Sequence, residues 1–235
     1  MRQTTMREQL IPSIKTNSLK SRSPSLIKLR DNTRDKKVLR KIPYAKTYDL
    51  PVVLSTNLRA VRNKTDELQL VASLNKADVV CVTESWLSPH IDDSLVALPG
   101  YNLIRRDRES GSGRGGVCLY LRTSYPCKML VNCEDRNIES LWMMLKPRSL
   151  PRSVSCIILC VIYHSTANGE IENAVLRDHV ETNLDTLLVK HPNALAIITG
   201  DFNPTSTGFI VKDLTHANNI KQMVKFKTRD SGTLD

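Results

Sequence analysis

The chain has 235 residues and a formal net charge of +10, a length that suits one domain with a substantial core plus a tail. Its longest apolar run, residues 154–163, is too short to cross a bilayer, and the polar N-terminus lacks the apolar segment of a signal peptide. These features argue against a membrane protein or a secreted protein, and we expect an intracellular protein of the nucleus or cytoplasm. The six cysteines show no C-x-x-C spacing and lie mostly in apolar segments, which predicts reduced, buried thiols.

The positive charge is concentrated in residues 1–46. This segment holds 13 Lys and Arg against three acids, and the basic and acidic residues of the remaining chain cancel. Because it has few large apolar side chains and no sustained period, we expect a disordered segment, followed by a folded domain over residues 47–235. Two roles fit the segment about equally: a basic tail that holds nucleic acid through its phosphates, or a solvated leader without a partner.

Residues 51–56 and 78–83 are short apolar, β-branched runs that predict two strands. Between them, residues 65–76 place apolar side chains near helical spacing and acids in the first turn, which predicts an amphipathic helix. A β-α-β unit of this kind brings its two strands side by side. We therefore expect Asn57 and Glu84, which follow these strands, at the same edge of the sheet.

A glycine-rich stretch at residues 109–116 separates two further segments with strand character, 102–108 and 117–121. A phosphate-binding loop is one interpretation, but the Gly-Lys-Ser/Thr ending of a P-loop is missing and the stretch leads into a strand. The pattern favours a hairpin connection.

The second half of the chain again alternates strands and a helix. Residues 139–146 and 154–163 predict two strands that are buried on both faces, because their apolar content is dense. Residues 171–190 predict an amphipathic helix that ends before a proline and leads into a buried strand at 194–199. The apolar side of this helix is expected to contain Ile171, Val175, Leu176, Leu184, Leu187 and Leu188.

Polar side chains close or follow four of the predicted strands: Asn57, Glu84, Tyr163, and Asp201 with Asn203. Each alone is typical of a strand end or turn, and only their repetition suggests a shared site. Oxygen ligands of this kind suit a hard cation such as Mg²⁺, and Asn and Tyr side chains donate hydrogen bonds to phosphate oxygens. The set indicates metal-assisted phosphoryl chemistry.

The histidines are left out of this set. His164 follows Tyr163 directly, but a lone histidine at a strand end is expected to be an exposed polar residue, and no carboxylate partner can be assigned to it. The same treatment applies to the other four histidines, His90, His179, His191 and His216.

Seven stretches resemble the motifs of one known family and occur in that family's order along the chain: Thr56-Asn-Leu-Arg-Ala60, Val82-Thr-Glu-Ser-Trp-Leu87, Pro99-Gly-Tyr101 through Arg106-Asp-Arg108, Gly115-Gly-Val-Cys-Leu-Tyr120, Glu139-Ser-Leu-Trp142, Val161-Ile-Tyr-His164 and Gly200-Asp-Phe-Asn203. Together they resemble the endonuclease/exonuclease/phosphatase superfamily. Within it, they are most similar to the apurinic-endonuclease-like domain of LINE-type non-LTR retrotransposons.

The resemblance implies an α/β fold with four layers, two packed mixed sheets flanked by helices. It also implies a phosphodiesterase, dependent on Mg²⁺ or on Mn²⁺ in its place, that nicks DNA and leaves a 3′-hydroxyl. Glu84 would be the main metal ligand with Asn57 beside it, and Tyr163 would contact the scissile phosphate. Asp201 would orient or deprotonate the attacking water, and Asn203 would stabilise the transferring phosphate. DNA is then the expected partner, without a membrane or a small-molecule cofactor, while nothing in the sequence bears on the oligomeric state.

The chain departs from the family pattern at its C-terminus. Thr228-Arg229 and Leu234-Asp235 resemble a stretch whose aspartate, here Asp235, orients a histidine, but the following strand and Ser-Asp-His motif are missing. The resemblance thus predicts a truncated sandwich that lacks its last strand or strands. Activity is expected to be impaired, since loss of a general acid or base costs on the order of 10² to 10⁴ in rate.

Three functions follow from these observations. The first is the DNA endonuclease domain of a retrotransposon, associated with a reverse transcriptase. The second is a non-catalytic nucleic-acid-binding remnant that relies on residues 1–46, and the third is a phosphatase or phosphodiesterase that acts on small phosphoesters. We rank the third last because Glu84-Ser-Trp-Leu87 and the stretch from Gly100-Tyr101 to Arg108 resemble the retroelement branch.

Overall fold

The computed structural model describes residues 50–108, 114–165, 167, 169–203, 210–217 and 220–224. The predictions for residues 1–46 and for Asp235 fall outside these ranges, as does the middle of the glycine-rich stretch, residues 109–113. The division of the chain after residue 46 therefore stays a prediction.

The first sheet forms around the β-α-β unit. Strands β1 (Val53–Asn57) and β2 (Val79–Thr83) pair in parallel, and helix α1 (Thr65–Leu74) connects them. Strands β3 (Tyr101–Arg106) and β4 (Val117–Arg122) form an antiparallel hairpin. The strand order is β1-β2-β4-β3, so both the β-α-β unit and the hairpin are confirmed.

The second sheet has the order β5-β6-β7-β8. Strands β6 (Ser140–Leu145) and β7 (Cys156–His164) are antiparallel neighbours, and both are almost wholly buried, as predicted. Helix α2 (Glu170–Lys190) connects β7 to the parallel strand β8 (Ala194–Phe202). The remaining elements were not predicted from the sequence: β5 (Cys127–Met129), α3 (Ile210–Ala217) and the 3₁₀ turns η1 (Val61–Asn63), η2 (Asp93–Val96) and η3 (Val131–Cys133).

Strand β8 continues beyond its predicted end at residue 199. Gly200 pairs in register with Ile162 of β7, and a Cβ at this position would lie 1.8 Å from the Ile162 carbonyl oxygen. With a φ of 144°, Gly200 allows the two backbones to approach here without ending the strand. As a result, Asp201 lies within the paired part of β8, opposite Tyr163.

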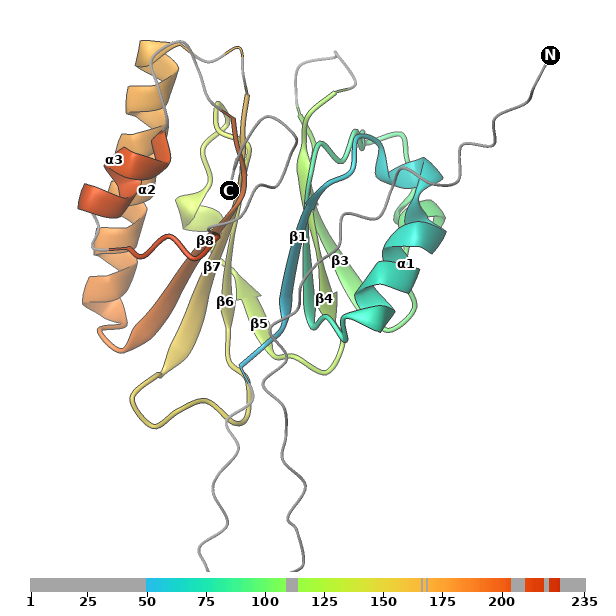
Figure 1. The fold of residues 1–235 in the computed structure, drawn as a ribbon, viewed down its shortest axis with the longest axis horizontal. Coiled ribbons are helices and arrows are strands. Elements are labelled where there is room, and N and C mark those ends of the chain that lie inside the picture. The colour runs from blue at the N-terminus through green and yellow to red at the C-terminus, as the bar shows by residue number, and fades with distance from the viewer. Residues whose placement is uncertain are drawn as a thin grey trace, which may run out of the picture. The chain divides into compact units, whose positions relative to one another are not determined.

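The two sheets pack face to face and carry helices on their outer faces (Figure 1). Between the sheets, Cys81 and Leu119 of the first sheet share one core with Leu141 and Leu159 of the second. A second core lies between the first sheet and α1, and a third lies between the other sheet and helices α2 and α3. The four-layer α/β sandwich is therefore confirmed.

Helix α2 covers the second sheet with a narrower apolar stripe than predicted. Leu176, Leu184 and Leu187 are buried, but Ile171 and Val175 are 77% and 46% exposed. Ile171 lies five positions before Leu176, which places it roughly 140° away around the helix axis. Neither α2 nor any other helix in the described part of the chain is long and apolar enough to span a membrane.

The cysteines behave as the sequence predicts. All six are free thiols, and all but Cys127 are buried. Burial raises the pKa of the Cys81 and Cys118 thiols, so both stay protonated as parts of the core.

Candidate active site

Five polar residues meet where strands of both sheets end. Asn57 is the last residue of β1 and Glu84 follows β2, while Tyr163 and Asp201 are paired residues near the ends of β7 and β8 and Asn203 comes just after β8. Parallel pairing within each β-α-β unit brings these ends to one edge of each sheet. The strand-end pattern of the sequence therefore corresponds to a real cluster.

Asn57 links the two sheets through its side-chain amide. Its Nδ2 donates one hydrogen bond to Glu84 Oε1 at 2.8 Å and another to Asp201 Oδ2 at 2.5 Å. An amide NH₂ has two hydrogens, so both donors are used. The prediction that Asn57 and Glu84 share an edge is confirmed, and Asp201 joins them from the other sheet.

Glu84 lies on a backbone turn that hydrogen bonds to two neighbouring segments hold in place. Glu84 and Trp86 have left-handed φ angles of 51° and 53°, which cost conformational energy for residues with side chains. The Glu84 carbonyl accepts a hydrogen bond from Ala60 N at 3.1 Å, and Trp86 N donates to the Gly115 carbonyl at 2.9 Å. These contacts fix the direction of the Glu84 carboxylate toward Asn57.

Tyr163 presents a protonated hydroxyl to the same cluster. Partial burial raises the pKa of the Tyr163 phenol above its ordinary value, and the nearby carboxylate of Glu84 raises it further, against the opposite effect of Arg108. The guanidinium of Arg108 lies 5.6 Å from the centre of the Tyr163 ring. At neutral pH the hydroxyl is therefore a hydrogen-bond donor, as a phosphate contact requires.

Asn203 is fixed by His164, a residue that was expected from the sequence to be exposed. His164 is instead fully buried, and its Nδ1 donates to the Asn203 carbonyl oxygen at 3.0 Å. Asn203 Nδ2 returns a hydrogen bond of 2.9 Å to the His164 carbonyl. His164 Nε2 contacts Asn173 Oδ1 at 2.6 Å, so the first turn of α2 covers the ring. The expectation for His164 was wrong because helix packing, which its neighbours in sequence do not reveal, encloses it.

The His164→Ala variant should lower the free energy of unfolding by about 2–3 kcal/mol, because it opens a cavity and removes the donor to the buried Asn203 carbonyl. Urea denaturation followed by circular dichroism would measure this change. His90 is exposed, so His90→Ala should shift the value by less than about 0.5 kcal/mol. Equal, small effects of both substitutions would show that the His164 contacts contribute little.

Two further residues near the cluster were not assigned to the site from sequence. Arg108 follows β3 and Glu139 precedes β6, and the Arg108 Nε donates to Glu139 Oε1 at 2.6 Å. Both lie in stretches that resemble the family motifs, and this resemblance is the feature of the sequence that could have identified them. Asp235 lies outside the described residues, so its orienting role stays a prediction.

The oxygen-bearing side chains of the cluster fit a Mg²⁺ ion. Asn57 Oδ1 is buried and has no hydrogen-bond partner in the described part of the chain, which makes it an acceptor suited to a cation. No group of three or more His, Cys, Asp or Glu side chains within the described ranges is arranged to hold a metal. Mg²⁺ is usually held by one or two carboxylates together with several waters and substrate phosphates, so a site at Glu84 and Asn57 would not require a third carboxylate.

Comparisons with known proteins identify the family and the fold of the chain. The model of the endonuclease/exonuclease/phosphatase family matches residues 53–208, while no curated protein gave a match. The fold is similar to the endonuclease domain of TRAS1, a telomere-specific non-LTR retrotransposon, with a TM-score of 0.58 and 16% identity over 79% of this chain and 82% of that one. It is also similar to the AP endonuclease LMAP from Leishmania major, with a TM-score of 0.50 and 20% identity over 65% of this chain and 55% of that one. A third similar structure is a mannosyl-6-phosphatase from Bacteroides thetaiotaomicron, with a TM-score of 0.50 and 17% identity over 72% and 70% of the two chains.

The structural likenesses show the fold, and the family match shows the relationship. The matched range covers more than half of the chain and includes all five residues of the strand-end cluster. Members of the matched family are hydrolases that act on phosphoester bonds. The chain belongs to the endonuclease/exonuclease/phosphatase family.

Proposed function

We propose that this chain is a metal-dependent phosphodiesterase that nicks DNA, in the manner of the endonuclease domain of a non-LTR retrotransposon. One observation carries the proposal: the Asn57 amide joins the carboxylates of Glu84 and Asp201, which come from different sheets. Two carboxylates that share one amide donor, with a tyrosine near them, would provide a metal ligand and a proton acceptor in one place. The similarity to the TRAS1 endonuclease domain supports DNA as the substrate.

The residues take distinct roles in the proposed reaction. Glu84 and Asn57 would hold Mg²⁺ or Mn²⁺, which supplies Lewis acidity toward the phosphate when bound. Asp201 accepts a proton from a water that attacks the phosphorus, and the bond from phosphorus to the 3′ oxygen breaks. The 3′ oxygen leaves and takes up a proton, so the products are a 3′-hydroxyl and a 5′-phosphate.

Tyr163 and Asn203 stabilise charge on the phosphate. The phenol of Tyr163 donates through its single hydrogen. Asn203 Nδ2 donates one hydrogen bond to the His164 carbonyl, and its second hydrogen would donate to a phosphate oxygen. Because Asn203 is held before substrate binds, its amide needs little reorganisation as charge develops.

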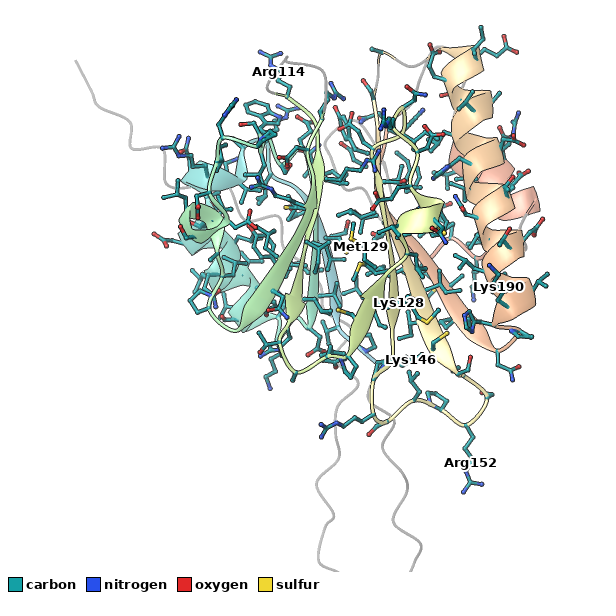
Figure 2. All side chains as sticks on the ribbon, turned by 180° about the vertical axis from the view of Figure 1, so that it is seen from behind. Arg114, Lys128, Met129, Lys146, Arg152 and Lys190 are labelled. Carbon is teal, nitrogen blue, oxygen red and sulfur yellow. The ribbon has the colours of Figure 1, made fainter. Side chains whose placement is uncertain are left out.

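Basic residues near the cluster favour a polyanion over a small phosphoester. Arg59 Nε lies 3.9 Å from Glu84 Oε2, and the Arg59 side chain is 65% exposed. Arg114, which belongs to the loop between β3 and β4, projects at one end of the sandwich, whereas Lys146 and Arg152 lie at the opposite end (Figure 2). A DNA backbone that runs past the cluster would meet this positive charge.

The test is the conversion of supercoiled plasmid to nicked circles by the full chain. Nicking is expected with Mg²⁺ and should stop when EDTA removes the metal. Inositol phosphate and sphingomyelin, incubated in parallel, should not turn over. Hydrolysis of a small phosphoester without plasmid nicking would replace the DNA proposal with the phosphatase alternative.

A further inference from the structure

Arg108 lies beside the proposed site but is not one of the five residues of the cluster. Its Nε donates to Glu139 Oε1 at 2.6 Å, and its Nη2 forms an ion pair with the same oxygen. The other oxygen of Glu139 accepts a hydrogen bond from the Gly116 backbone N–H. Both carboxylate oxygens thus serve to hold one guanidinium against the start of β4.

The surroundings of the guanidinium restrict it further. A Cβ at Gly115 would lie 2.5 Å from Arg108 Cζ, so the glycine backbone packs directly on the group. On another side, the Tyr163 ring centre is 5.6 Å away. The Glu139 carbonyl also accepts a hydrogen bond of 2.9 Å from Tyr163 N, so Glu139 connects Arg108 to the strand that carries the tyrosine.

One edge of the guanidinium is left for another partner. Among the residues that the structure describes, Arg108 Nη1 has no hydrogen-bond partner, and the side chain is 27% exposed. The carboxylates of Glu84 and Asp201, which act on Tyr163 electrostatically, would repel an approaching phosphate diester. A guanidinium held in a fixed orientation beside them offsets this repulsion and offers the planar donor geometry that phosphates match.

We propose that Arg108 binds a backbone phosphate of the nucleic acid substrate through Nη1, and that Glu139 is the positioning residue that orients it. The inference rests on the proposed function for its substrate class. It adds a second anion contact next to Tyr163, supplied by the β3–β4 connection rather than by a strand end.

Arg122 provides a matched control on the same sheet. Its Nε lies 3.3 Å from Asp78 Oδ1, and its guanidinium lies 5.3 Å from the Tyr101 ring centre. It therefore has the same kinds of contact as Arg108. Arg122 ends β4, however, whereas Arg108 lies by the start of that strand, so the two arginines are at opposite ends of the sheet.

The experiment measures the affinity of the full chain for a DNA duplex in EDTA as a function of salt. The slope of log affinity against log salt should fall by about one unit in Arg108→Gln, because one phosphate contact is lost, and stay unchanged in Arg122→Gln. The double variant Arg108→Gln with Glu139→Gln keeps the net charge, and its slope should fall by the same amount. Its two amide side chains form a neutral hydrogen-bonding pair, so it serves for the measurement if the single variant does not fold. Glu139→Gln alone should keep the slope but bind more weakly, since the arginine remains without its orienting carboxylate.

Several results would overturn the inference. These are an unchanged slope in a folded Arg108→Gln variant, an equal loss in Arg122→Gln, or no DNA binding by the unmodified chain. Unchanged affinity in Glu139→Gln would remove its positioning role. Plasmid nicking is scored separately, so a protein that shows the Arg108-dependent slope but never nicks would contradict the proposed function and leave the phosphate contact in place.

Discussion

The Asp201→Asn variant is expected to lower the nicking rate by roughly 10³-fold or more, because it removes the proton acceptor for the attacking water. The substitution is nearly isosteric, and Asp201 is only 3% exposed, so the packing of β8 should survive. The amide oxygen can still accept the hydrogen bond from Asn57. Activity should therefore fall far more than stability does.

A matched aspartate away from the site tests whether the loss is local. Asp213 on α3 forms an exposed ion pair of 3.2 Å with Arg177, a kind of contact that contributes little to stability. Asp213→Asn should nick at the unmodified rate. If both variants lose activity equally, or if Asp201→Asn keeps more than about a tenth of the rate, then Asp201 is not the proton acceptor.

The Glu84→Gln variant should abolish nicking at ordinary Mg²⁺ concentrations, with a loss that is also on the order of 10³, because it removes the negative charge with which this carboxylate would hold the divalent cation. Its amide oxygen still accepts from Asn57, so the fold around the turn is expected to persist. Titration of Mn²⁺ into the metal-free protein measures the effect directly, because binding should weaken together with activity.

Glu67→Gln is the corresponding control. Glu67 is exposed in the first turn of α1, away from the strand ends, and its charge should not affect the metal. Equal Mn²⁺ affinity of the unmodified protein and Glu84→Gln would move the metal site elsewhere. Loss of affinity in Glu67→Gln would indicate a diffuse charge effect rather than coordination.

Most strands were predictable because burial on both faces produces short, dense apolar runs. The elements that were missed lack this signal. Strand β5 has only three residues, two of them exposed, and α3 is too short for its apolar positions to establish a period. The end of β8 was placed too early because Gly200 normally indicates a turn, whereas here it allows close approach to Ile162.

The site was predictable to the extent that it depends on topology. Residues that end parallel strands meet at one edge, which is why Asn57, Glu84, Tyr163 and Asp201 could be grouped before any contact was known. The contacts of His164 and Arg108 depend on tertiary packing. The ring of His164 is covered by Asn173 from α2, and Arg108 is held by Glu139, which lies 31 positions later. No local pattern specifies these partners.

The most direct test of the central claim compares plasmid nicking by the unmodified chain and by the double variant Glu84→Gln with Asp201→Asn, prepared identically and shown to be folded. A contaminating nuclease would nick equally in both preparations. We expect Mg²⁺-dependent nicks with extendable 3′-hydroxyl ends from the unmodified chain and none above background from the double variant. Equal nicking by the two proteins would contradict the assignment of this cluster as a phosphodiesterase site, and no nicking by either would contradict the proposed nicking activity of this chain.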